Sequence, residues 1–278
     1  LDGPLGTELA ARGVSTKLPW WSATALVDAP NVVAENHHEY AEAGATDHTA
    51  NTFRTKRRTV GDRWFGLTRT ADQIARNAVD PQHRVAGCIS PLEDCYRPDL
   101  SPGEASREEH RELAEALAAA GCDLLLCETF PHVDEAITAV KESVRSGLPT
   151  WLALTAGPDA NLLSPEQMAT GAKRAVDAGA SAVLVNCTPA RETLPFVQSL
   201  ARAIPSVPIG AYANAGHVDD EVGWNSTGEL STSRRGAELY RELATQWMTA
   251  GATLIGGCCG TTPQHIAELH SAVSDVNG

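Results

Sequence analysis

A ten-residue pattern recurs four times along the chain and marks the passage from a helix to a strand. Each copy follows an Ala/Glu/Arg-rich stretch with helical periodicity, begins with Ala-Gly, and ends on polar or sulfur-bearing residues. The copies are AGATDHTANT (43–52), AGCDLLLCET (120–129), AGASAVLVNC (178–187) and AGATLIGGCC (250–259). Glycine is common just past a helix end because it tolerates positive φ. Short apolar runs such as DLLLC and SAVLV are typical of strands buried on both faces.

Three more segments have the composition of strands and lie between these copies, at 84–90, 150–156 and 207–214. The opening Leu-Asp-Gly would end a very short first strand. About eight strands, seven of them preceded by a helix, predict a closed (β/α)8 TIM barrel, whose usual length is ~250 residues. The alternative is a doubly wound open sheet, but its G-x-G-x-x-G turn is missing after the first strand. No Pro/Gly/Ser-rich linker divides the chain, so we expect one domain over 1–278, with a long loop at 216–233.

Charge and cysteine content exclude several classes of protein. The formal net charge of −13 disfavours nucleic acid and anionic membrane surfaces as partners, because both attract basic proteins. The basic cluster at 54–59 is short, and we interpret it as a solvated loop or the start of a helix in preference to an anion site. No apolar run approaches the ~18 residues of a membrane span, and the first residues lack the pattern of a secretory signal. Seven scattered cysteines favour reduced thiols in the cytoplasm over a disulfide framework.

Aligning the four copies brings their last two residues into register. These pairs are Asn51-Thr52, Glu128-Thr129, Asn186-Cys187 and Cys258-Cys259. In a barrel the carboxyl ends of the strands meet at one rim, where active sites are built, so Cys187 is expected beside the Cys258–Cys259 pair. Three thiolates suit Zn²⁺ and leave a fourth tetrahedral position open, as in catalytic zinc sites. A thiol in that position would be held as the reactive thiolate.

Other interpretations of the same residue types stay open. Each cysteine taken singly is more often a buried core residue, and we expect Cys88, Cys122 and Cys127 to be core. Cys95 lies in a predicted loop without an evident partner. We interpret His37 and His38, on a helix remote from the rim, and His48, in a strand, as structural or surface residues.

Two acidic residues share the predicted rim. Glu128 follows the apolar run LLLC, and Asp2 lies at the end of the first strand. Beside a thiol site they could hold the ammonium group of an amino-acid substrate through charge-assisted hydrogen bonds.

Six blocks of sequence together resemble the homocysteine S-methyltransferase family. They are LDGPLGTELAARG, PWWSA, ANTFRT, CETF, VNCTP and IGGCCGTTPQHI, and they span nearly the whole chain. The resemblance implies a (β/α)8 barrel with zinc on Cys187, Cys258 and Cys259. It implies that homocysteine is bound by Asp2, Gly3 and Glu128, with Thr129 and Asn186 beside them, and that the product is methionine.

The methyl donor is less constrained. PWWSA and VNCTP resemble the branch that uses S-methylmethionine, whereas the segments after 216 and at 90–100 depart from it. Trp20, Trp21, Tyr96 and Trp224 could face a sulfonium or ammonium group by cation–π attraction, although each is typical of loop packing as well. S-adenosylmethionine and betaine remain alternative donors, and another thiol or a selenol is an alternative acceptor. A non-catalytic zinc- or thiol-binding barrel and a purely structural barrel are the competing classes.

Overall fold

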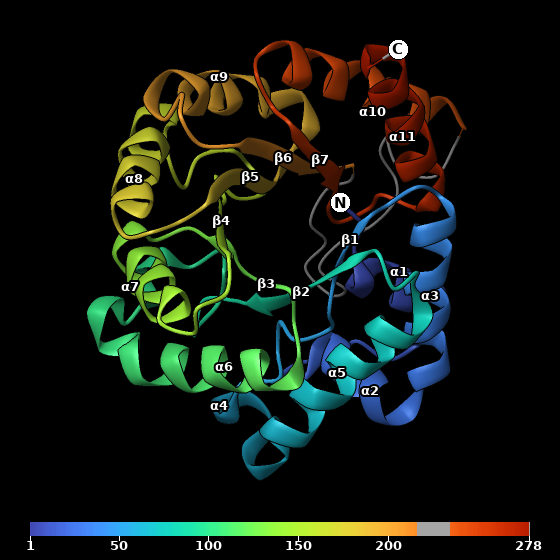
Figure 1. Ribbon diagram of the computed structural model, residues 1–278, viewed down its shortest axis with the longest axis vertical. Helices are drawn as coiled ribbons and strands as arrows, with labels where there is room; N and C mark the ends of the chain where they lie inside the picture. The colour runs from blue at the N-terminus through green and yellow to red at the C-terminus, as the bar shows by residue number, and fades with distance from the viewer. Residues whose placement is uncertain (216–233, 278) are drawn as a thin grey trace.

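Seven parallel strands form one curled sheet in a computed structural model, which describes residues 1–215 and 234–277 (Figure 1). Every strand pairs with its neighbours in chain order, so the order in the sheet is β1 to β7. The strands are β1 (Asp47–Thr49), β2 (Arg84–Ile89), β3 (Leu124–Phe130), β4 (Thr150–Leu154), β5 (Ala182–Pro189), β6 (Ile209–Asn214) and β7 (Leu254–Gly257). The predicted loop at 216–233, with Trp224, lies outside the described residues.

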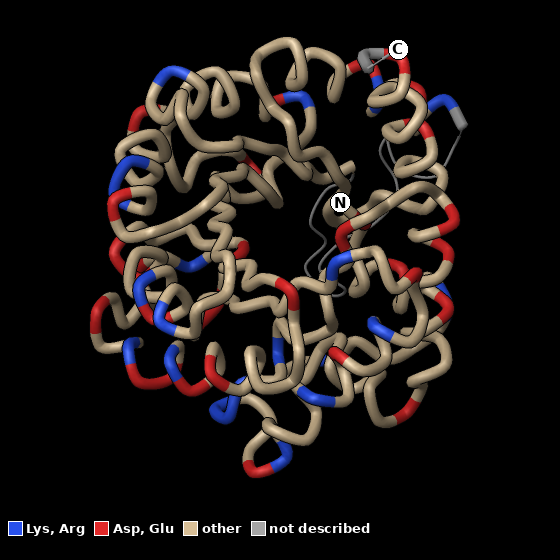
Figure 2. Tube along the Cα trace, in the orientation of Figure 1, with Lys and Arg blue, Asp and Glu red and all other residues tan. Residues whose placement is uncertain are grey.

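Helices surround the sheet and cover its outer face (Figure 1). The longer ones are α3 (Pro30–Glu42), α5 (Trp64–Ala78), α6 (Arg107–Ala120), α7 (Val133–Val144), α8 (Pro165–Asp177), α9 (Leu194–Ala203), α10 (Arg234–Thr249) and α11 (Pro263–Asn277). Short helices α1 (Leu5–Ala11), α2 (Ala25–Asp28) and α4 (Arg57–Val60) lie in the first quarter of the chain. Most Lys, Arg, Asp and Glu residues lie along this outer layer of helices and the adjoining loops (Figure 2). Among the residues described, no helix has the length and apolar character that crossing a bilayer requires.

The glycines of the repeated pattern end helices as predicted. Gly44, Gly121, Gly179 and Gly251 have φ angles of 102°, 109°, 105° and 111°. A residue with a Cβ is strained in this left-handed region. Each glycine therefore lets the chain leave a helix and turn back into the next strand.

The predicted closed barrel of about eight strands is confirmed only in its coarser form. Residues 1–3 are not in a strand, but their backbone groups bond to both ends of the sheet. On the β1 side, Asp2 N donates to Asp47 O at 2.9 Å. On the β7 side, Leu1 N donates to Ile255 O at 2.8 Å, and Gly257 N donates to Asp2 O at 3.1 Å. The fold is thus a TIM-barrel-like α/β fold with seven strands, and this segment spans the two edge strands.

Side chains of the strands alternate between two cores. Leu125, Leu152 and Val183 pack under the helices in the larger cluster. Their chain neighbours Leu124, Leu126 and Leu184 point to the inner side of the curled sheet, where a second cluster also holds Cys187, Cys258 and Cys259. The alternation follows from the period of two in a strand. This second cluster lies inside the curled sheet, away from the helices.

Candidate functional site: three thiols and two acids at one end of the sheet

A cavity of about 920 Å³ opens at the carboxyl ends of the strands. This is within the usual size range of small-molecule sites. Residues that end strands line one part of it, and loop residues line the rest. The first group comprises Thr49, Glu128, Thr129, Cys187, Tyr212, Gly257, Cys258 and Cys259. The second includes Trp21, Phe53, Arg54, Asp94, Cys95 and Tyr96.

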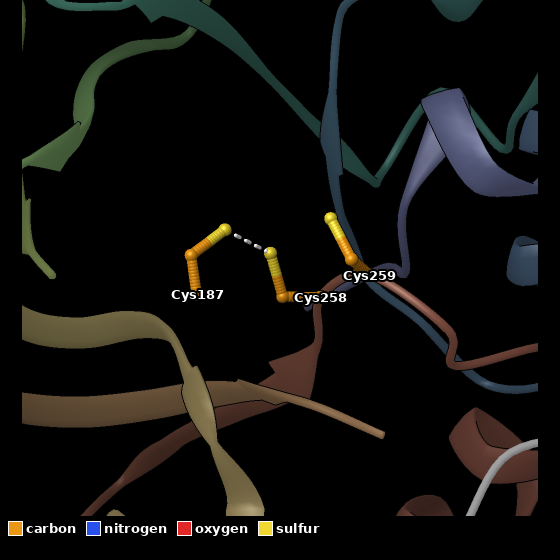
Figure 3. A group of neighbouring side chains, drawn as sticks. All are labelled: Cys187, Cys258 and Cys259. Atoms are coloured by element: carbon orange, nitrogen blue, oxygen red, sulfur yellow. Dashed lines mark hydrogen bonds between the residues drawn. The ribbon is translucent and has the colours of Figure 1, made fainter. Parts of the chain in front are cut away.

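The three predicted cysteines meet at this cavity (Figure 3). Their sulfur atoms all lie within 4.8 Å of one another, and the Sγ atoms of Cys187 and Cys258 are 2.6 Å apart. The exposed fractions are 5%, 9% and 7% for Cys187, Cys258 and Cys259. All three are free thiols. Three soft sulfur donors grouped this closely, with one side facing a cavity, fit the ligand set of a catalytic zinc site.

An unusual backbone conformation turns Cys187 into this group. Strict alternation along β5 would send Cys187 to the helix side together with Val183 and Val185. Instead it has φ 47°, and the pairing of β5 with β6 shifts register between Asn186 and Pro189. Thr129, its counterpart in the repeat, has φ 62° beside a matching shift between Cys127 and Phe130. Non-glycine residues rarely adopt positive φ, and such strain concentrates at functional sites.

The thiols influence one another's protonation. Hydrogen bonds from Cys187 and Cys259 lower the pKa of Cys258 to about 5. The contact with Cys258 raises the pKa of Cys187, and burial followed by the same hydrogen bonds raises the pKa of Cys259. One thiolate is therefore stabilised within the group even before a cation is considered.

The two predicted acids lie in the same cavity. Asp2 is 5% exposed, and its carboxylate accepts hydrogen bonds from Thr49 N at 2.8 Å and Thr49 Oγ1 at 3.2 Å. Glu128 accepts hydrogen bonds from the Cys88 thiol at 2.8 Å and from the Tyr212 hydroxyl at 3.0 Å. Burial raises the pKa of each carboxyl to about 7. An ammonium group in the cavity would relieve this cost by favouring the ionised form.

The remaining predicted substrate residues occupy different positions. Gly3 lines the cavity, and a Cβ there would lie 2.6 Å from the Tyr40 ring. Thr129 also lines it, and its hydroxyl contacts the Cys187 sulfur at 3.8 Å. Asn186 is fully buried and donates from Nδ2 to Thr129 Oγ1 at 2.8 Å. Asn186 thus reaches the cavity only through Thr129.

Two expectations about individual residues need correction. His37 is not remote from the rim, because its ring nitrogens, those of His48 and the Asp2 carboxylate form a group within 4.8 Å. Burial lowers the pKa of His37 to about 4, so the ring is neutral. The basic cluster is solvated only in part: Arg57 and Arg58 are exposed in α4, whereas Lys56 is buried and Arg54 lines the cavity. Cys88, Cys122 and Cys127 are buried as expected.

Several cavity residues carried little signal in the sequence. Tyr212 pairs with Asn186 in the sheet, which places it at the same rim. Its strand lacks the Ala-Gly start of the repeat, so the self-alignment did not include it. Arg54 and Cys95 lie in the loops that follow β1 and β2. A loop has no regular period from which the sequence could predict that these two residues line the cavity. Of the four aromatic candidates, Trp21 and Tyr96 line the cavity, whereas the Trp20 ring carries the Arg63 guanidinium at 5.0 Å.

Comparisons with known proteins agree on one family. A family model described as homocysteine S-methyltransferase matches residues 1–273. A homocysteine S-methyltransferase of Escherichia coli (strain K12) is 33% identical over 97% of this chain and 93% of its own. A selenocysteine Se-methyltransferase of Brassica oleracea var. italica is 28% identical over 97% of this chain and 87% of its own. The crystal structure of the E. coli homocysteine methyltransferase MmuM in its metallated form superposes with a TM-score of 0.78, at 28% identity over 98% and 94% of the two chains.

Proposed function

Because the chain belongs to the homocysteine S-methyltransferase family, we propose that it transfers a methyl group from a sulfonium donor to homocysteine, giving methionine. The proposed donors are S-methylmethionine and S-adenosylmethionine. The observation that supports this most directly is the group of three buried thiols beside two buried acids in one cavity.

We propose that Cys187, Cys258 and Cys259 bind Zn²⁺. The donor set fits the ion because thiolates are preferred zinc ligands, and the lowered pKa of Cys258 shows that the site favours a thiolate. Zinc bound there would lower the pKa of the acceptor thiol and keep it nucleophilic at neutral pH. The protein's own part is to keep the three sulfur atoms together, which the inward turn at Cys187 does.

We assign the acceptor's ammonium group to Asp2 and Glu128. Both carboxylates lie in the cavity that holds the thiols, and burial raises the pKa of each. We assign the amino-acid end to Gly3 as well, because it lines the cavity beside Asp2. Asn186 bonds Thr129, and the Thr129 hydroxyl contacts the Cys187 sulfur. With sulfur and ammonium fixed at two points, the acceptor has one orientation toward the donor methyl. Such positioning is itself a large part of catalysis of a methyl displacement.

We further propose that residues 1–3 take the place of the eighth strand, so that one (β/α)8 domain spans 1–278. The hydrogen bonds from this segment to β1 and β7 support the proposal. They also fix Asp2 next to Cys258. Seven free thiols suit a reducing compartment, and we propose the cytoplasm.

A selenol is the second candidate acceptor. The similarity to the Brassica selenocysteine Se-methyltransferase favours it, because a selenolate would use the same three cysteines. Betaine as donor and a non-catalytic zinc-binding role are further alternatives. The assay described next distinguishes these alternatives from transfer of a methyl group from a sulfonium donor.

Purified protein loaded with zinc would be tested with homocysteine and selenocysteine against S-methylmethionine, S-adenosylmethionine and betaine. We expect about one zinc per chain, bound by the three-thiol site, and methionine from a sulfonium donor. Methionine from betaine alone would replace the donor assignment. Bound zinc without turnover of any pair would support the non-catalytic role.

A further inference from the structure

Arg54 brings a positive charge into the proposed substrate cavity. It follows β1 in the segment Asn51-Thr52-Phe53-Arg54 and lines the cavity together with Phe53. Its Nε is buried and has no hydrogen-bond partner. The guanidinium carbon lies 5.6 Å from the centre of the Phe53 ring. The side chain is thus held against an aromatic ring and retains unused hydrogen-bond donors.

Many other arginines of the described chain are paired with carboxylates. Arg57 bonds Glu112, Arg84 bonds Asp47, and Arg174 bonds Asp134. Arg54 forms no such ion pair among residues 1–215 and 234–277, although the chain has 35 acidic residues against 22 basic ones. A partly buried guanidinium is costly without an anion, and a carboxylate matches its two parallel N–H donors. The unused donors therefore suit an anionic group of a ligand in the cavity.

The surroundings of Arg54 indicate which substrate this is. The positive charge of Arg54 acts to lower the pKa of Lys56, in the loop after β1, and of Cys95, in the loop after β2. Asp2 bonds Thr49, and Glu128 bonds Cys88 and Tyr212. Arg54 instead lies over the ring of Phe53, which packs against Trp21 with ring centroids 5.6 Å apart. The ammonium and carboxylate of an amino acid share one carbon atom. A homocysteine held at Asp2 and Glu128 would therefore keep its carboxylate beside them and away from Arg54.

We propose that Arg54 binds the carboxylate of the methyl donor. The donor class is then an onium compound that carries a carboxylate, such as a sulfonium amino acid. Trp21, Phe53 and Tyr96 line the same cavity and offer aromatic faces to the onium group. The assignment rests on the proposed function, and it predicts the donor specificity. A donor without a carboxylate lacks the contact with Arg54 and should bind more weakly.

The test compares donors and variants in one grid. The donors are S-methylmethionine and its carboxylate-free counterpart, (3-aminopropyl)dimethylsulfonium, each with saturating homocysteine and zinc-loaded enzyme. The variants are Arg54→Met, Arg54→Lys and the control Arg63→Met. Arg63 is a matched control because it also lies over an aromatic ring, that of Trp20, but outside the cavity lining.

We expect Arg54→Met to raise KM for S-methylmethionine by about tenfold to hundredfold, the range of a lost charge-assisted contact. KM for the carboxylate-free donor and for homocysteine should stay within about twofold, as should every constant of Arg63→Met, since surface changes away from the site have small effects. Arg54→Lys should restore part of the loss, because it keeps the charge without the planar fork.

Two kinetic outcomes would overturn the proposal. In one, KM for homocysteine rises in Arg54→Met while the donor's stays constant, so that the anion belongs to the acceptor. In the other, both donors weaken equally, so that Arg54 acts through the loop and not through a carboxylate. Circular dichroism of each variant checks that the fold is retained.

A parent enzyme that forms no methionine would contradict the proposed function and would leave the Arg54 assignment to a binding measurement. Calorimetric titration with S-methylmethionine then decides. Tighter binding to the parent than to Arg54→Met supports the carboxylate contact, and equal binding refutes it.

Discussion

The two sides of the cavity are built from different kinds of structure. The acceptor side, which we define as Asp2, Glu128 and the three cysteines, consists of residues at or beside strand ends and held by the sheet. The donor side, defined as Trp21, Phe53, Arg54, Cys95 and Tyr96, consists of residues from loops. Strand pairing fixes the first group relative to one another, whereas the second depends on loop packing. Within one fold, the sulfur chemistry can thus be kept while the loops change the donor, as loop variation does in TIM barrels generally.

Removing one sulfur ligand should have the largest effect. We expect Cys259→Ala to lower zinc affinity by about a hundredfold or more, because even the loss of a residue that only hydrogen-bonds to a metal ligand costs tenfold to hundredfold. Methionine formation should fall at least as far. Zinc content by elemental analysis and product formation provide the measurements. The control is Cys95→Ser, a cavity thiol of the donor side, which should keep its zinc. A Cys259→Ala protein that binds zinc and turns over like the parent would refute the site.

Neutralising one acid should affect the acceptor and spare the donor. Glu128→Gln keeps the shape of the side chain and removes its charge, so KM for homocysteine should rise by about tenfold to hundredfold. Tyr212→Phe is the control, because it removes only a hydrogen bond to Glu128. If KM for homocysteine is unchanged in Glu128→Gln, or if KM for the donor rises instead, Glu128 does not belong to the acceptor side.

An aromatic change should affect the donor more weakly. Trp21→Leu removes a cavity-lining ring, and we expect KM for a sulfonium donor to rise by about three- to thirtyfold, the range of a partly desolvated cation–π contact. Trp20→Leu serves as control because that ring lies outside the cavity lining. Equal effects of the two substitutions would indicate loop packing in place of donor recognition.

The last expected effect is on the pH dependence of stability and not on turnover, and it concerns a lysine beneath the donor side. Lys56 is 2% exposed and donates hydrogen bonds to Ser90 Oγ and the Pro91 carbonyl, and burial lowers its pKa from 10.5 to about 7. Between these values the unfolded chain binds one more proton than the folded chain. This group therefore makes the free energy of unfolding rise with pH across the window, by about 1.4 kcal/mol per unit at most.

Urea unfolding of the parent and Lys56→Met at pH 7 to 9.5 measures that slope. The parent should gain stability relative to the variant as the pH rises. A constant difference would show that Lys56 stays protonated in the folded protein.

The sequence predicted the acceptor side better than the donor side, and the reason is physical. The repeat relates Glu128, Cys187 and Cys258 because hydrogen-bonded strands share a register, which survives long separations in the chain. No comparable rule relates Arg54 to Cys95, since each loop takes its shape from contacts made after folding. His37 shows another limit, because the periodicity of a helix does not say which neighbours its buried face will meet. The first strand was predicted from only three residues and became a bridging segment.

The bonds between residues 1–3 and β7 have a consequence for synthesis on the ribosome. Leu1 and Ile255 are 254 positions apart, and Asp2 is translated long before Cys258 and Cys259. Contacts of such long range form late and slow folding. Residues 1–3 therefore lack their partners in β7 until that strand has been synthesised. The proposed metal site would therefore be among the last parts of this fold to form during synthesis.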